Sequence, residues 1–104
     1  MPTTEHVVVA EFTNDTQSEM RLFLEMTCEE IFLAPGQHIE LLAKPSAHLL
    51  PLTFAYLKDG IQVFPHKEWD PDWMIRFEGQ LIKPQFPTRL SGLVTASGDG
   101  PQSP

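Results

Sequence analysis

Residues 20–41 read MRLFLEMTCEEIFLAPGQHIEL, and the fold prediction rests on how apolar side chains are spaced in this segment. Apolar and polar side chains alternate through residues 20–26, with Phe23 as the exception. A period of two residues is typical of a strand that buries one face. Pro35-Gly36 then predicts a turn, and the alternation resumes over residues 39–43. The segment therefore predicts short strands joined by tight turns.

Turn signals of the same kind recur at short intervals along residues 6–86. Asp59-Gly60 lies between two apolar runs and is a strong signal for a two-residue hairpin turn, because both positions can take a positive φ. We predict an all-β fold, a small antiparallel β-sandwich of about seven or eight short strands. The turn signals are Asn14-Asp15, Pro35-Gly36, Lys44-Pro45-Ser46, Asp59-Gly60, Asp70-Pro71-Asp72 and Glu78-Gly79.

One alternative is a helix over residues 19–34. Thr16-Gln17-Ser18-Glu19 has the form of a helix capping box, and the apolar residues that follow would share one face of a helix. The fold would then be α+β with one helix. The strand prediction is favoured because Thr27-Cys28 and Ile31-Phe32 suit strands better than a helix, and because the neighbouring segments are strand-like.

The composition changes after Phe86. Residues 87–104, PTRLSGLVTASGDGPQSP, are rich in Pro, Gly, Ser and Thr, which predicts a disordered C-terminal tail. Residues 1–86 are then predicted to form a single β-sandwich domain. Arg89 and Asp99 are the only charged side chains of the tail, so the net charge of −7 belongs to the domain.

The run from Leu22 to Leu41 is consistent with a strand, an acidic turn, a second strand, a Pro-Gly turn and a third strand. This pattern resembles one found in small uncharacterised bacterial β-sandwich proteins, of the type LLLEPWGEE…L.PG. The chain departs from the pattern at Met26-Thr27-Cys28, which stands where the pattern has Pro-Trp-Gly. The resemblance implies a compact sandwich and a bacterial origin, and it brings no catalytic residues.

The charge balance and the absence of a long apolar run disfavour several classes of protein. The chain has 14 acidic and 7 basic residues, and the basic ones are scattered, which disfavours binding to nucleic acid. No apolar run approaches the roughly 18 residues that a membrane span needs, and the first residues do not have the pattern of a signal peptide. Cys28 is the only cysteine, so no internal disulfide is expected. We predict a cytoplasmic protein that does not associate with membranes.

Residues 66–73, HKEWDPDW, form the densest polar and aromatic stretch of the chain. One interpretation is that one tryptophan anchors the loop in the core while the carboxylates cap the turn. A second is recognition, because exposed aromatic rings beside carboxylates suit sugar rings or an apolar patch on a partner. A third is a metal site, although the stretch lacks the ligand spacing and the glycine of a calcium loop. The candidate binding residues are His66, Trp69, Asp70, Asp72 and Trp73.

Catalytic and cofactor chemistry has little support in the sequence. Glu25, Glu29 and Glu30 surround Cys28, and nearby negative charge keeps a thiol protonated and weakly nucleophilic. The four histidines have no HxH or HxxxH spacing that would bring two metal ligands to one face. We therefore predict no catalytic residues, no metal and no cofactor.

The resulting prediction is a small acidic binding or protein-interaction module that is not catalytic. Its partner is expected to be an unknown protein or a small ligand. A homodimer is a further possibility, because small sandwiches have exposed edge strands and a limited core. The alternatives are a metal-dependent or hydrolytic enzyme that uses His and Asp residues, and a carbohydrate-binding module.

Overall fold

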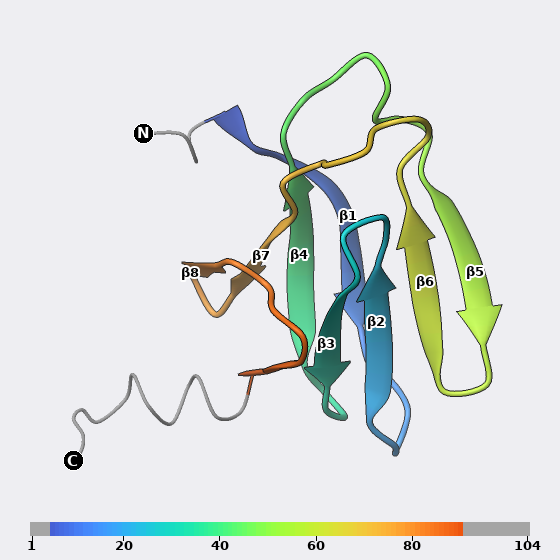
Figure 1. The fold of residues 1–104 in the computed structure, drawn as a ribbon. Coiled ribbons are helices and arrows are strands. Elements are labelled where there is room, and N and C mark those ends of the chain that lie inside the picture. Colours follow the sequence, from blue (N-terminus) through green and yellow to red (C-terminus); the bar gives the residue numbers. More distant parts are fainter. Residues whose placement is uncertain (1–4, 91–104) are drawn as a thin grey trace.

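Nine strands form in the computed structural model of the protein, which describes residues 5–90. They make two sheets that pack face to face (Figure 1). The strands are β1 (Val7–Thr13), β2 (Met20–Leu24), β3 (Glu29–Leu33), β4 (His38–Ala43), β5 (Thr53–Leu57), β6 (Gly60–Phe64), β7 (Met74–Phe77), β8 (Gln80–Ile82) and β9 (Thr88–Arg89).

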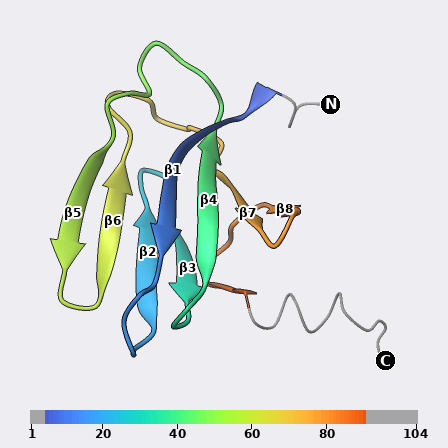
Figure 2. The same ribbon diagram turned by 180° about the vertical axis from the view of Figure 1, so that it is seen from behind.

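One sheet has four strands in the order β1-β4-β7-β8, and the other has five in the order β5-β6-β2-β3-β9. Figure 1 shows the five-stranded sheet in front, and Figure 2 shows the four-stranded sheet from behind. Most neighbouring strands are antiparallel, whereas β2 pairs with β6 and β3 pairs with β9 in parallel. The predicted small β-sandwich is confirmed.

The segment that carried the fold prediction forms the β2–β3 hairpin. Leu22 lies opposite Ile31 and Met20 lies opposite Leu33, so the alternating apolar side chains share the inner face of the sheet. The alternative helix over residues 19–34 is wrong, because burial of this face against the other sheet outweighs the local capping signal. The turn of the hairpin places Cys28 at a φ of 65°, in the left-handed region.

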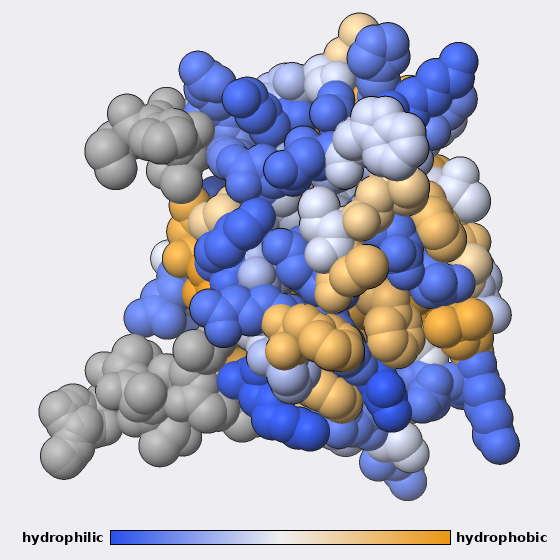
Figure 3. Space-filling model, viewed as in Figure 1, coloured by the Kyte–Doolittle hydropathy of each residue, from blue (hydrophilic) through white to orange (hydrophobic). Residues whose placement is uncertain are grey.

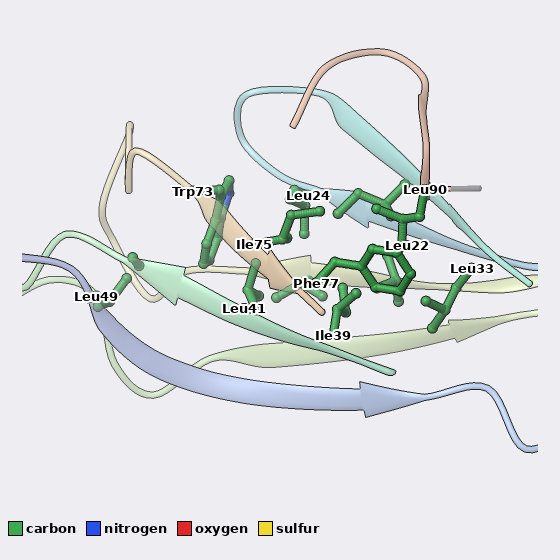
Figure 4. Close-up of a cluster of buried hydrophobic side chains, with 13 residues drawn as sticks. Leu22, Leu24, Leu33, Ile39, Leu41, Leu49, Trp73, Ile75, Phe77 and Leu90 are labelled. Carbon is green, nitrogen blue, oxygen red and sulfur yellow. The ribbon is translucent and has the colours of Figure 1, made fainter. Parts of the chain in front are cut away.

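The core lies between the inner faces of the two sheets. Figure 4 shows side chains from β2, β4 and β7 pointing into this common layer. Leu49, from the connection between β4 and β5, and Leu90, which follows β9, also reach it. The buried core cluster consists of Leu22, Leu24, Ile31, Leu33, Ile39, Leu41, Ala43, Leu49, Val63, Trp73, Ile75, Phe77 and Leu90.

Phe23, the exception to the alternation, lies on the outer face of the five-stranded sheet. The guanidinium of Arg21 lies 5.9 Å from the ring centre of Phe23 and 5.4 Å from that of Phe32. Glu30 is buried beside them, and its carboxylate accepts a hydrogen bond from Arg21 at 3.2 Å. Cation–π contacts and this ion pair allow aromatic rings to remain on an outer face. Apolar area is visible on this face in Figure 3.

The predicted hairpin at Asp59-Gly60 is present, but the reason given for the glycine is wrong. Gly60 has no positive φ and is the first residue of β6. A Cβ at Gly60 would lie 2.4 Å from the carbonyl oxygen of Arg21. The glycine is therefore needed for the close approach of β6 to β2, and Lys58 and Asp59 form the turn.

The folded domain continues past residue 86, where the sequence predicted a tail. Thr88 and Arg89 form β9 against β3, and Leu90 is buried in the core. The guanidinium of Arg89 lies 3.9 Å from the ring centre of Phe32. Few apolar residues are enough to form β9, because this short segment pairs with β3 at the edge of an existing sheet. Residues 91–104 of the predicted tail lie outside the described residues.

We predict that Gly60→Ala destabilises the protein by about 3 kcal/mol, because β2 and β6 must move apart to admit the methyl group. Gly79→Ala is the matched control, since Gly79 has open space around its Cβ position and a φ of +81°. It should cost only about 1 kcal/mol, from left-handed strain alone. Urea unfolding of the two variants measures both values, and equal losses would contradict the role assigned to Gly60.

Candidate functional site

All five candidate residues lie in residues 65–73, the connection that leads from β6 to β7 and thus from one sheet to the other. Backbone hydrogen bonds tie this segment to the loop between β4 and β5. The N–H of His66 donates to the carbonyl of Leu49 at 2.9 Å, and the N–H of Lys67 donates to that of His48 at 2.7 Å. The two connections lie side by side at one end of the sandwich (Figures 1 and 2).

The two tryptophans of this segment have opposite environments. Trp73 is fully buried in the core, and its indole N–H donates to the carbonyl of Glu25 at 2.8 Å (Figure 4). Trp69 is 78% exposed. The structure thus matches the interpretation in which one tryptophan anchors the loop, and it leaves the other available at the surface.

A surface hollow of about 330 Å³ lies beside Trp69. It is formed where two parallel strands end, because Met26 follows β2 and residues 65–69 follow β6. The N–H of Glu25 donates to the carbonyl of Val63 at 2.9 Å, which holds these two chain segments together. Of the candidate residues, Trp69 and His66 line the hollow. Its lining consists of Met26, Pro65, His66, Lys67, Glu68 and Trp69.

The carboxylate of Glu68 fixes the chain immediately before Trp69. It accepts hydrogen bonds from the hydroxyl of Ser46 at 2.6 Å and from the N–H of Asp70 at 3.5 Å. The Ser46 hydrogen bond holds the pKa of Glu68 below its ordinary value. The side chain is therefore ionised at neutral pH, and it links the two connections at this end of the sandwich.

Asp70 and Asp72 shape the turn and do not line the hollow. The N–H of Asp72 donates to the carboxylate of Asp70 at 3.0 Å. The carboxylate of Asp72 lies 3.1 Å from the ammonium of Lys83 and 3.3 Å from Nε2 of His6. The Lys83 hydrogen bond is the main reason that the pKa of Asp72 is lowered. Asp72 also takes a φ of 52°, which aspartate tolerates better than most residues.

The acidic residues around Cys28 do not converge on one site. Glu25 accepts a hydrogen bond from the amide of Gln62 at 3.1 Å, and Glu29 accepts one from the hydroxyl of Thr27 at 2.6 Å. Glu30 pairs with Arg21 on the outer face of the sheet. Glu29 and Glu30 are consecutive residues of β3, and consecutive side chains of a strand point to opposite faces of the sheet. Acidic residues that are close in the sequence are therefore not close in space.

Metal-binding groups are likewise dispersed. His6 contacts Asp72, whereas His38 lies on β4 with its ring 2.6 Å from the hydroxyl of Thr13 and 3.2 Å from the carboxylate of Glu11. Within residues 5–90, no group of three or more His, Cys, Asp or Glu side chains is placed to hold a metal ion.

Sequence reasoning missed the contribution of Met26 to the hollow. Met26 is about forty positions away from Trp69 along the chain, and only the parallel pairing of β2 with β6 brings them together. No local signal marks such a pairing. Sequence reasoning also did not show that Glu68 supports the loop through its hydrogen bond with Ser46.

No family model, curated protein or solved structure matches the chain. The resemblance of residues 22–41 to bacterial sandwich proteins therefore stays a prediction. In the described part of the chain, no helix has the length and apolar character needed to cross a membrane.

We predict that Lys83→Met lowers the free energy of unfolding by about 0.5 kcal/mol at pH 7, a modest loss because the ion pair with Asp72 is half-exposed. A carboxyl whose pKa is lowered by folding adds stability above its unfolded value of 3.8. That stability is lost as the pH falls through the lower folded-state pKa. Lys83 also lies 3.6 Å from the carboxylate of Glu29 and donates to the carbonyl of Trp73 at 3.1 Å. The difference between the variant and the natural chain should therefore shrink in acid to the part that the Trp73 hydrogen bond contributes.

Lys58→Met is the control for this experiment, because the Lys58 side chain is exposed in the β5–β6 turn. Denaturant titrations of all three chains from neutral to acidic pH provide the comparison. A loss of stability in Lys83→Met that stays constant down to the lowest pH would contradict a role of Lys83 through the carboxylates of Asp72 and Glu29.

Proposed function

We propose that this protein is a non-catalytic binding module that recognises a protein partner through Trp69 and the adjoining hollow. The observation that carries the proposal is the exposure of Trp69, 78%, on a loop whose neighbouring residues are fixed. Glu68 is held by Ser46 on one side, and the buried Trp73 anchors the chain on the other. Little conformational entropy is therefore lost when a partner covers the indole ring.

The chemistry of the hollow suits an apolar or aromatic side chain of a partner. Trp69, Met26 and Pro65 provide apolar contact, and Met26 is itself about half exposed. His66, Lys67 and Glu68 provide polar groups at the same hollow. Its volume of about 330 Å³ is at the lower end of the range for ligand pockets, which favours one side chain over a large cofactor.

The charge of the chain supports a partner that is neither nucleic acid nor an anionic membrane. The net charge is −7, and such a surface repels polyanions at long range. An exposed tryptophan beside fixed polar groups is the composition typical of a protein-binding hot spot. These properties together favour a peptide segment that presents an apolar anchor.

We predict that peptides selected from a random library against the protein bind Trp69→Ala at least about tenfold more weakly than the natural chain. Phe86→Ala is the matched control, because Phe86 is a similarly exposed aromatic residue that does not line the hollow. Fluorescence anisotropy of the labelled peptides measures both affinities. Selected peptides that bind Trp69→Ala as tightly as the natural chain would refute the proposal, provided that circular dichroism shows the variant to be folded.

A carbohydrate is the second candidate ligand, favoured by one observation. An exposed indole ring with nearby polar side chains, as at Trp69 and His66, suits the stacking and hydrogen bonding of a sugar ring. Protein recognition is preferred because the carboxylates of Asp70 and Asp72 are turned to the loop and to Lys83.

An NMR titration that follows the indole N–H resonances of Trp69 and Trp73 distinguishes a carbohydrate ligand from a protein partner. Titration with cello-, malto-, xylo- and chito-oligosaccharides should move the Trp69 resonance if sugars bind at the hollow. The Trp73 resonance is an internal control, since its N–H is bonded to Glu25 in the core. We expect neither resonance to move with sugars, and a saturable shift of Trp69 alone would replace the protein partner by a carbohydrate.

A further inference from the structure

Strand β5 is an unprotected edge of the five-stranded sheet. It pairs with β6 on one side, and its five residues, TFAYL, include neither a charged residue nor a proline. Figures 1 and 2 both show β5 and β6 projecting to one side beyond β1 of the other sheet. The backbone groups along the outer side of β5 are therefore free to pair with another strand.

The other edges of the described sandwich are better protected. Strand β1 has a shift of register between Val8 and Ala10, and it carries the charged Glu11. Strand β8 has only three residues, and β9 has two. A bulge, a charge and short length are the features by which proteins prevent edge-to-edge pairing, and β5 has none of them.

The side chains of β5 also leave apolar surface exposed. Tyr56 and Phe54 lie on the inner face of the sheet, where it extends beyond the other sheet, and they are 79% and 37% exposed. The ring of Phe54 makes an edge-to-face contact with Phe12 of β1, with 5.9 Å between ring centres. On the other face, Leu57 is 43% exposed. An edge strand with this much exposed apolar surface is a site of association.

We propose that β5 pairs with β5 of a second copy of this chain, antiparallel and about a two-fold axis at Ala55. When two copies of a strand pair about a two-fold axis, residues that lie opposite one another point to the same face of the sheet. Ala55 is the middle residue of β5, so an axis at Ala55 lets all five residues of the strand pair. Thr53 then lies opposite Leu57 of the second copy, and Phe54 lies opposite Tyr56 of the second copy.

This register is self-complementary in its side chains. Two Phe54–Tyr56 pairs meet on the inner face, and cross-strand aromatic pairs are among the more stabilising ones in sheets. No charged residue lies within the paired segment, so no like charges are opposed. The two five-stranded sheets become one continuous sheet across the dimer.

The association is weak and depends on salt. Five residues on each side bury less area than a typical stable interface. Each chain also has a net charge of −7, so the two copies repel one another at low ionic strength. Raising the salt concentration from about 0.05 M to about 0.5 M should therefore increase the dimer fraction.

Sedimentation velocity over a range of protein concentrations tests the dimer. The mass of the natural chain should rise from 11.8 kDa toward twice that value, more readily at high salt. Tyr56→Glu should weaken the dimer at least about tenfold, because it places a charge at the paired edge. Leu81→Glu on β8 is the control and should leave association unchanged. A monomer at every concentration, or equal effects of the two variants, would refute the proposal.

Disulfide cross-linking tests the register. In a Cys28→Ser background, Ala55→Cys places two thiols directly across the two-fold axis, within the reach of a disulfide. Thr53→Cys places its two thiols four residue positions apart along the paired strands, which is too far. Mild oxidation should cross-link Ala55→Cys and leave Thr53→Cys monomeric. Equal cross-linking of both variants, or of neither, would overturn this register, whatever the outcome of the Trp69 experiments.

Discussion

The parallel pairing of β2 with β6 is the constraint on which the rest of the structure depends. It joins the β2–β3 hairpin to the β5–β6 hairpin and so creates the five-stranded sheet. The approach is so close at Arg21 that only glycine fits at position 60. Because the two strands run in the same direction, the segments that follow them leave the sheet at the same end. Met26 and residues 65–69 meet there, and the hollow beside Trp69 is the result.

The arrangement of charge is governed by the alternation of side chains along strands. Glu25, Glu29 and Glu30 are close in the sequence but lie apart in the structure, and each carboxylate has its own hydrogen-bond partner. On the outer face, Arg21 contacts the rings of Phe23 and Phe32 and donates a hydrogen bond to Glu30. The net charge of −7 therefore describes a dispersed surface property and does not mark a single acidic site.

Much of the fold could be predicted, because burial of one sheet face imposes a period of two residues on each strand. This held for the segment around Leu22 and for the hairpin at Asp59-Gly60. The role of Gly60 could not be predicted, because its contact is with the backbone of Arg21, far away in the sequence. β9 was missed for the same reason, since two residues form a strand only where an existing sheet edge receives them.

The composition of residues 66–73 indicated where the candidate site lies, and the packing of the two sheets determined which of its side chains are exposed. The sequence by itself determined that two tryptophans and two aspartates share one turn-rich loop, because residue types and turn chemistry are local properties. Only the tertiary structure decided that Trp73 enters the core while Trp69 remains exposed. It also decided that Met26 completes the hollow. These outcomes depend on which surfaces two sheets bury against each other, and that is set by pairings between strands distant in the chain.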